Sequence, residues 1–214
     1  MAIVVIGGQC SKIGKTSVVC ALIEALPERR WTAIKMTQCK HDAAAGERCD
    51  CEIGNGAFAI SEERDPTTGA DSSRYLAAGA VRSLWVRTRP GRLAEAMPPI
   101  REEIGKSQNA ILESNSALEF LQPDLYACVL DPEIADFKAS ALRYLDRADA
   151  LLLPEGRTWQ PRLSGFPFEA IERIPQFRIA PPSYCPAGFV SFVAQRLNGA
   201  TEGSRDPGSR IQPA

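Results

Sequence analysis

A short glycine-containing segment near the N-terminus constrains the fold of this chain more than any other feature. Residues 2–6 form a β-rich apolar run, and residues 15–26 follow with apolar side chains at helical intervals on one face. Between them, residues 8–16 read Gly-Gln-Cys-Ser-Lys-Ile-Gly-Lys-Thr, a composition typical of a loop that binds phosphate. A strand, a glycine-containing turn and a helix in this order predict an α/β domain with a nucleotide site at the turn.

Each part of this loop has a chemical purpose. Successive backbone N–H groups and the helix N-terminus would face phosphate oxygens, Lys15 would reach the β- and γ-phosphates, and the Thr16 hydroxyl would bind Mg²⁺. Gly8 and Gly14 are separated by five residues where the usual pattern has four, so Gln9 stands where glycine is usual. The predicted nucleotide-binding residues are Gly8, Gln9, Cys10, Ser11, Lys12, Ile13, Gly14, Lys15, Thr16 and Ser17.

The rest of the chain alternates between strand-like and helix-like segments. This alternation predicts a mostly parallel β-sheet flanked by helices, with ligands at the carboxyl ends of the strands. We expect further strands at 32–36, 57–60, 81–86, 110–112, 125–130 and 150–153, and helices at 71–78, 93–104, 116–121 and 134–145.

Composition divides the chain into three predicted regions. Residues 1–154 form the nucleotide-binding domain, and residues 155–197 form an irregular Pro-rich extension packed on it, with a strand at 177–179 and a helix at 188–197. Residues 198–214 carry Gly, Ser, Pro and charge without aromatic side chains, so we expect a disordered tail.

Charge and hydropathy exclude two kinds of partner. The 25 Lys+Arg and 26 Asp+Glu residues give a formal net charge of −1, and no basic run suited to a phosphate backbone occurs, so we expect no nucleic acid. The first apolar run ends at two glycines after residue 6, far short of the ~20 apolar residues of a membrane span. We therefore expect a cytoplasmic protein without a membrane segment.

Two polar residues at the ends of predicted strands are candidates for catalysis beside Lys15. Lys35 would extend its ammonium into the crevice that holds the phosphates, where it could stabilise transferring charge; a solvated lysine at a strand end fits equally well. Glu113 closes an apolar strand, so it could hold Mg²⁺ together with Thr16 or orient a nucleophile. The simpler interpretation of the polar residues after Glu113 is a helix cap made by a serine.

Two aspartates are weaker candidates for a second carboxylate. Asp42 lies in the long polar segment after residue 36. Asp71 begins a predicted helix, where it could equally serve as the N-terminal acid, paired with Arg74 one turn later.

A cluster of thiols with the single histidine of the chain suggests a metal site. Cys39, His41, Cys49 and Cys51 would suit Zn²⁺, or an iron–sulfur cluster if Cys10 replaces His41. The one-residue gap within each pair fits many metals and no particular one, so free reduced thiols are the alternative. The total of seven cysteines, an odd and unevenly spaced set, does not favour a disulfide framework.

Several segments resemble known P-loop proteins. The five-residue loop spacing resembles dethiobiotin synthetase-like enzymes of the deviant P-loop group. A broader resemblance, over roughly residues 2–130, is to the molybdopterin-guanine dinucleotide biosynthesis protein B (MobB) family. It is carried in order by the loop, Ala33-Ile34-Lys35-Met36-Thr37 with His41-Asp42, Asp71-Ser72-Ser73-Arg74-Tyr75-Leu76-Ala77-Ala78-Gly79-Ala80, and Ile111-Leu112-Glu113.

The resemblance implies a SIMIBI-like P-loop NTPase fold and a function. A MobB-like protein would bind GTP, in preference to ATP, with Mg²⁺, hydrolyse it slowly and serve molybdenum-cofactor biosynthesis. Its expected partners are a molybdopterin guanylyltransferase (MobA-like) and a second copy of the chain. The preference for GTP rests on the resemblance alone, because an Asn/Lys/Asp base-reading motif is missing.

Two other functions remain open at this stage. The loop spacing favours an ATP-dependent ligase or kinase of the dethiobiotin synthetase type, with Lys35 near a small carboxylated substrate. The cysteine cluster between Cys39 and Cys51 favours a metal-handling protein controlled by its nucleotide state.

Overall fold

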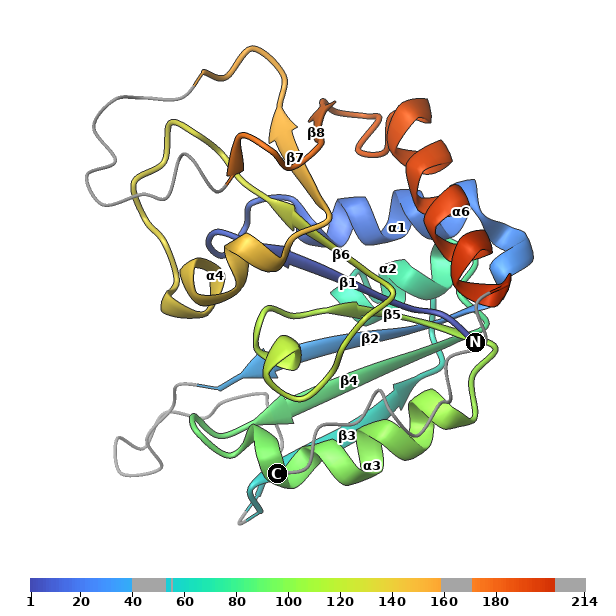
Figure 1. The fold of residues 1–214 in the computed structure, drawn as a ribbon. Helices are drawn as coiled ribbons and strands as arrows, with labels where there is room; N and C mark the ends of the chain where they lie inside the picture. The colour runs from blue at the N-terminus through green and yellow to red at the C-terminus, as the bar shows by residue number, and fades with distance from the viewer. Residues whose placement is uncertain (40–52, 55, 159–170, 203–214) are drawn as a thin grey trace.

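An eight-stranded sheet organises the molecule, as the computed structural model shows for residues 1–39, 53–54, 56–158 and 171–202 (Figure 1). The strand order is β3-β4-β2-β5-β1-β6-β7-β8, and every pairing except β3 with β4 is parallel. The strands are β1 Ile3–Gly8, β2 Trp31–Gln38, β3 Phe58–Glu63, β4 Arg82–Thr88, β5 Asn109–Glu113, β6 Leu125–Val129, β7 Ala150–Pro154 and β8 Gln176–Ile179.

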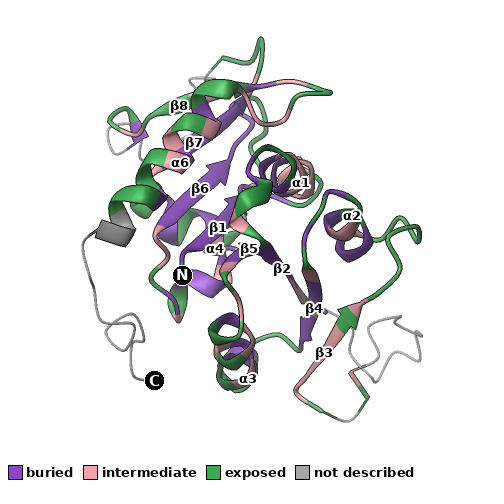
Figure 2. Cartoon of the chain, turned by 90° about the vertical axis from the view of Figure 1, so that its right-hand side faces the viewer, coloured by how far each residue is buried: buried purple, intermediate pink, exposed green. Residues whose placement is uncertain are grey.

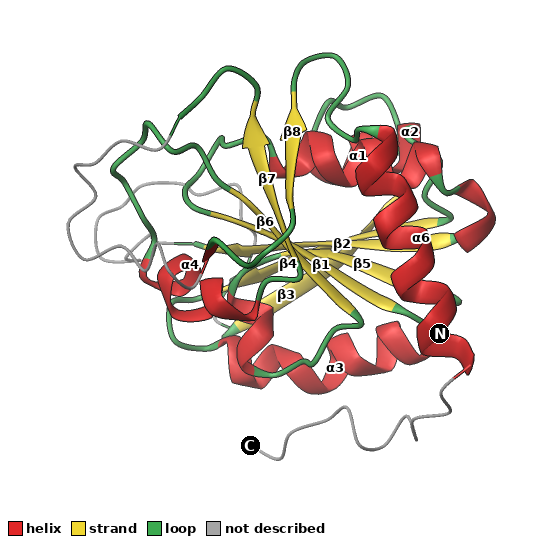
Figure 3. Ribbon diagram, turned by 45° about the horizontal axis from the view of Figure 1, so that its top comes forward, coloured by secondary structure: helices red, strands yellow, loops and turns green. Residues whose placement is uncertain are grey.

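Helices cover both faces of this sheet (Figure 3). The α-helices are α1 Lys15–Ala25, α2 Asp71–Ala77, α3 Leu93–Gly105, α4 Ala139–Tyr144 and α6 Ala187–Glu202. The 3-10 turns are η1 Pro27–Arg29, η3 Ser116–Glu119 and η4 Leu145–Arg147. The predicted α/β class, a mostly parallel sheet flanked by helices, is confirmed. No helix in the described part of the chain is both long and apolar enough to cross a membrane.

Strand β1 lies near the middle of the sheet because its side chains are apolar on both faces. Ile3 and Val5 belong to the core under α3, whereas Val4 and Ile6 belong to the core under α1, α2 and α6. Figure 2 shows buried residues along β1 and β6 and exposed residues on the outer side of α6. Both faces of β1 are covered, so the residues that follow this strand lie at the carboxyl edge of the sheet, where ligands bind in parallel sheets.

The structure corrects one predicted helix. The apolar spacing predicts a helix over residues 134–145, but α4 begins only at Ala139. The Ile134 carbonyl accepts a hydrogen bond from the Gln9 side chain, and the Lys138 N–H donates to the Gln9 carbonyl at 2.9 Å. These backbone groups therefore bind the loop after β1 instead of forming a helical turn, a contact that periodicity does not reveal.

The segment predicted as residues 155–197 contributes to the same sheet. β8 pairs with β7, and Phe189 of α6 is buried in the apolar layer that also contains α1. Helix α6 continues to Glu202, so residues 198–202, expected in the tail, are helical. The remainder of the predicted tail, residues 203–214, lies outside the described residues.

A close approach at the end of β1 gives a first prediction. A Cβ atom on Gly7 would lie 2.2 Å from Asn115 Oδ1 and 2.7 Å from the Tyr126 ring. We expect Gly7→Ala to lower the free energy of unfolding by about 1–3 kcal/mol, because these buried neighbours must move. Urea denaturation measures this change. Gly105→Ala is the control, since no atom beyond its chain neighbours and its own helix lies within 4 Å of the added Cβ, and an equal loss in both variants would contradict the packing argument.

Candidate functional site

The loop after β1 is fixed at its first residue by the neighbouring strand β5. Asn115 follows β5, and its side-chain amide makes two hydrogen bonds of 2.8 Å, accepting from the Gly8 N–H and donating to the Gly8 carbonyl. Asn115 is buried, so this pair of bonds is shielded from water. The start of the loop therefore has one defined position relative to the end of β5.

Gln9 joins the next part of the loop to β6, the strand that neighbours β1 on the side opposite β5, and to the segment that follows β6. Its backbone N–H donates to the Val129 carbonyl at 3.0 Å, and its side-chain Oε1 accepts from the Asp131 N–H at 2.8 Å. The side-chain amide also donates to the Ile134 carbonyl, and Gln9 is fully buried. The residue that replaces the usual glycine thus joins the loop to the segment after β6.

The end of the loop places a lysine over its backbone. Gly14 has a φ of 100°, a left-handed conformation that suits glycine, and α1 begins at the next residue. The Lys15 ammonium donates to the Cys10 carbonyl at 2.7 Å. Burial lowers the pKa of Lys15, although the negative charge of Glu113 opposes the shift. A desolvated ammonium beside the N-terminus of α1 is a favourable environment for a phosphate anion.

Glu113, the last residue of β5, is the centre of a buried polar cluster that also includes Lys35, which lies within β2. The Thr16 hydroxyl donates to its Oε2 at 2.7 Å, and the Lys35 ammonium lies 2.5 Å from its Oε1. The Tyr75 hydroxyl donates to Oε2 as well. Only 3% of the Glu113 side chain is exposed, so these three partners replace the water that a carboxylate otherwise requires.

The pairing of β2 with β5 explains why Lys35 meets Glu113. The two residues are direct partners in the parallel register, so their side chains leave the sheet on the same face. The structure thus brings together Thr16, Lys35 and Glu113, three residues that the sequence singled out separately. A hydroxyl beside a carboxylate is an oxygen donor set that suits Mg²⁺, so these residues fit the expected metal.

Asp71 also reaches this cluster. Its Oδ2 lies 2.8 Å from the Lys35 ammonium, and its Oδ1 lies 3.7 Å from Arg74 Nη1. The pairing with Arg74 expected from the sequence is therefore present but is the longer of the two contacts. Burial tends to raise the pKa of Asp71, but the hydrogen bond and charge of Lys35, the hydrogen bond with Thr16 and the charge of Arg74 together lower it.

Sequence reasoning missed two residues of the site: Asn115, which holds the start of the loop, and Tyr75, which belongs to the Glu113 cluster. Asn115 stands two residues after Glu113, in a run of polar residues at a strand end, and this position was the available signal. Tyr75 lies one helical turn after Asp71, and only the packing of α2 on the sheet shows that it faces Glu113. Ser114 does accept a hydrogen bond from the Ala117 N–H at 3.1 Å, so the serine cap coexists with the Glu113 cluster.

The predicted cysteine and histidine ligands fall mainly outside the structure. Cys39 is buried, and its N–H donates to the Thr88 carbonyl at 2.9 Å. His41, Cys49 and Cys51 lie outside the described residues, as does Asp42. Within the described ranges, no group of three or more His, Cys, Asp or Glu side chains could hold a metal ion.

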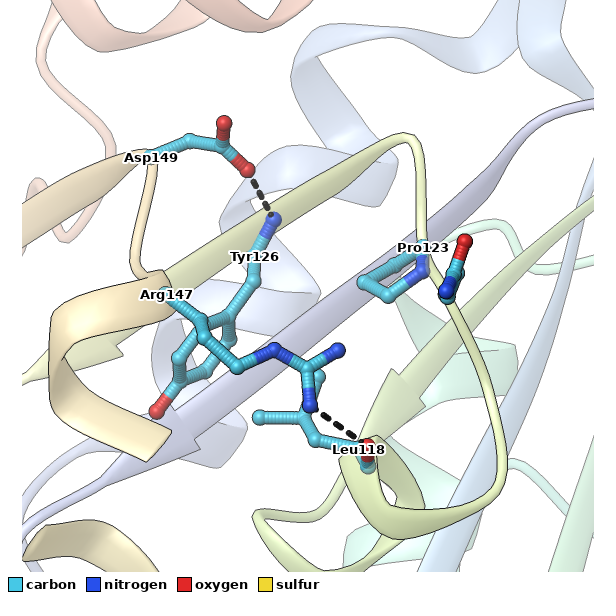
Figure 4. Close-up of a pocket in the computed structure, with 6 residues that line it drawn as sticks. Leu118, Pro123, Tyr126, Arg147 and Asp149 are labelled. Carbon is cyan, nitrogen blue, oxygen red and sulfur yellow. Dashed lines mark hydrogen bonds between the residues drawn. The ribbon is translucent and has the colours of Figure 1, made fainter. Parts of the chain in front are cut away.

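A cavity of about 240 Å³ lies at the opposite edge of the sheet (Figure 4). It is placed at the amino ends of β6 and β7, away from the loop after β1. Two of its polar side chains are engaged within the chain, since Asp149 accepts from the Tyr126 N–H and Arg147 donates to the Leu118 carbonyl, each at 2.8 Å. The loop after β1, with its cluster of charges, is therefore the stronger candidate site.

Comparisons with known proteins do not define a family for this chain. No protein-family model and no curated protein sequence matches the chain. Among solved structures, HypB from Helicobacter pylori in complex with nickel is similar at 14% identity and a TM-score of 0.49, over 95% of this chain and 90% of that one.

A second similar structure is the "apo" form of LpxK from Aquifex aeolicus in complex with ATP. It has 18% identity and a TM-score of 0.45, over 83% of this chain and 53% of the LpxK chain. At such identities and TM-scores, the functional assignment must come from the geometry of this chain. The structure itself shows an α/β fold in which a glycine-containing loop joins the central strand β1 to helix α1.

The contacts of Gln9 predict its contribution to stability. Gln9→Ala leaves the Asp131 N–H and the Ile134 carbonyl without their partner, so we expect unfolding to require about 1–3 kcal/mol less free energy. Gln195→Ala, at an exposed position of α6, is the control and should change little. Denaturant titration of both variants provides the comparison; equal stabilities would show that the Gln9 contacts are unimportant.

The environment of Tyr75 predicts a pH dependence. Burial, together with the charge of Glu113, raises the pKa of Tyr75 well above the ordinary 10.0, so the folded chain keeps this proton where the unfolded chain releases it. The Tyr75 contribution to stability is therefore present below pH 10.0 and is lost as the pH rises further. Between about pH 8 and 11, the free energy of unfolding should fall less steeply for Tyr75→Phe than for the wild type. Identical slopes would contradict this assignment.

Proposed function

We propose that this chain binds a Mg²⁺-bound purine nucleoside triphosphate on the loop from Gly8 to Thr16 and hydrolyses it slowly. The observation that carries the proposal is the position of Lys15 over the loop, next to a Thr16 hydroxyl that contacts a buried carboxylate at 2.7 Å. An anion site and an oxygen site for a divalent cation are thus adjacent at the N-terminus of α1.

The residues of the site have separate roles in this proposal. Lys15 neutralises the β- and γ-phosphates, while Thr16 and Glu113 hold Mg²⁺, directly or through water. The metal, when bound, supplies charge neutralisation for the phosphate oxygens. Lys35 lies within 3.4 Å of Thr16 Oγ1, so its ammonium is available to stabilise charge on the transferred phosphoryl group.

The biological role in this proposal is that of a MobB-like accessory protein of molybdenum-cofactor biosynthesis. GTP is preferred over ATP, and the nucleotide state controls docking to a molybdopterin guanylyltransferase (MobA-like). A second copy of the chain would close the site. The support for these points is the resemblance of four ordered sequence segments, two of which contain Lys35 and Glu113, residues that contact each other.

One alternative has its own support. A ligase or kinase of the dethiobiotin synthetase type, using ATP, is favoured by the longer loop and by the position of Lys35 beside Thr16. Turnover separates the two functions. Slow GTP hydrolysis stimulated by a guanylyltransferase supports the first, whereas rapid phosphoryl transfer from ATP that requires an added small carboxylic acid supports the second.

Replacement of Lys15 tests nucleotide binding directly. We expect Lys15→Met to weaken binding of Mg²⁺-GTP roughly a hundredfold or more, because the phosphates lose a partly buried cation. Isothermal titration calorimetry with GTP and then ATP gives the affinities, and circular dichroism checks the fold. Lys106→Met, on an exposed lysine at the end of α3, is the control. Unchanged affinity in Lys15→Met would overturn the proposed function.

A further inference from the structure

The ammonium of Lys35 lies among the groups proposed to hold the divalent cation. Its Nζ is 2.5 Å from Glu113 Oε1 and 3.4 Å from Thr16 Oγ1. A carboxylate as deeply buried as that of Glu113 requires a compensating positive charge. Lys35 supplies this charge from inside the chain.

A second acceptor for the same ammonium comes from a different element. Asp71, the first residue of α2, lies 2.8 Å from Lys35 Nζ, and its side chain also hydrogen-bonds with Thr16. The exposed fractions of the side chains rise from 3% for Glu113 to 17% for Lys35 and 39% for Asp71. Lys35 therefore bridges a buried acceptor and a more exposed one.

We propose that Lys35 is an internal counter-ion of the cation site, and that Asp71 is the positioning residue that holds Lys35 when a divalent cation binds Thr16 and Glu113. This inference rests on the proposed function. Two cations at one carboxylate repel each other, so the metal and the ammonium compete for Glu113. The flexible stem of lysine allows its ammonium to shift toward Asp71 without movement of the backbone.

Other charges around Lys35 are consistent with this exchange. Arg74 Nη1 lies 3.7 Å from Asp71 Oδ1, whereas Lys35 contacts Asp71 Oδ2. Burial lowers the pKa of Lys15, and the positive charge of Lys35 contributes in the same direction. Transfer of the Lys35 charge from Glu113 to Asp71 leaves the buried carboxylate free for a metal.

Binding of Mn²⁺ alone, without nucleotide, tests the exchange by electron paramagnetic resonance of the free ion. The full chain is compared with Lys35→Met, Asp71→Asn and the double variant. Lys35→Met should bind Mn²⁺ about tenfold more tightly, because its partly screened competing charge is gone. Asp71→Asn should bind several-fold more weakly than the wild type, yet should have little effect when Lys35 is already methionine.

The controls and contrary outcomes distinguish this inference from the proposed function. Lys106→Met should retain the wild-type affinity, and Lys35→Gln provides a second neutral variant if Lys35→Met does not fold. Measurable binding that is no tighter in the Lys35 variants than in the wild type overturns the inference. If Asp71→Asn weakens Mn²⁺ binding equally in the wild type and in Lys35→Met, the inference is also overturned. Asp71 would then affect the metal through its own negative charge and not through Lys35. No Mn²⁺ binding in any variant overturns the proposed metal site itself.

Discussion

The buried carboxylate of Glu113 is the interaction on which the arrangement of the site depends. It lies at the end of a central strand, where no solvent compensates its charge, so hydrogen-bond donors must come from other elements. Thr16 comes from α1, Lys35 from β2 and Tyr75 from α2. One buried charge thus aligns the first turn of α1 with two neighbouring elements, and with them the loop that precedes α1.

The loop itself is held from both sides of β1. Asn115 holds Gly8 against the end of β5, and Gln9 reaches the segment after β6. Such hydrogen bonds between buried groups define one loop conformation, because any alternative leaves a buried donor or acceptor unpaired. The start of the loop is therefore held in one position before any ligand arrives, which reduces the entropic cost of binding an anion.

Much of this arrangement could be predicted from the sequence because it depends on local patterns. The apolar strand, the glycines and the helix identify the loop, and the parallel strand ends explain why Lys35 and Glu113 face the same edge. Tyr75, Asn115 and the interactions of Gln9 could not be predicted, since each depends on contacts between distant segments. A contact between distant segments also explains why the helix predicted to begin at residue 134 begins at Ala139. The Gln9 side chain donates a hydrogen bond to the Ile134 carbonyl.

The most direct test of the account is a crystal structure of the chain with Mn²⁺ and a non-hydrolysable GTP analogue, with the metal located by its anomalous scattering. The account predicts phosphates on the loop from Gly8 to Thr16, with the metal beside the Thr16 hydroxyl and the Glu113 carboxylate. Phosphates bound elsewhere, or a metal held by other side chains while this loop stays empty, would contradict it.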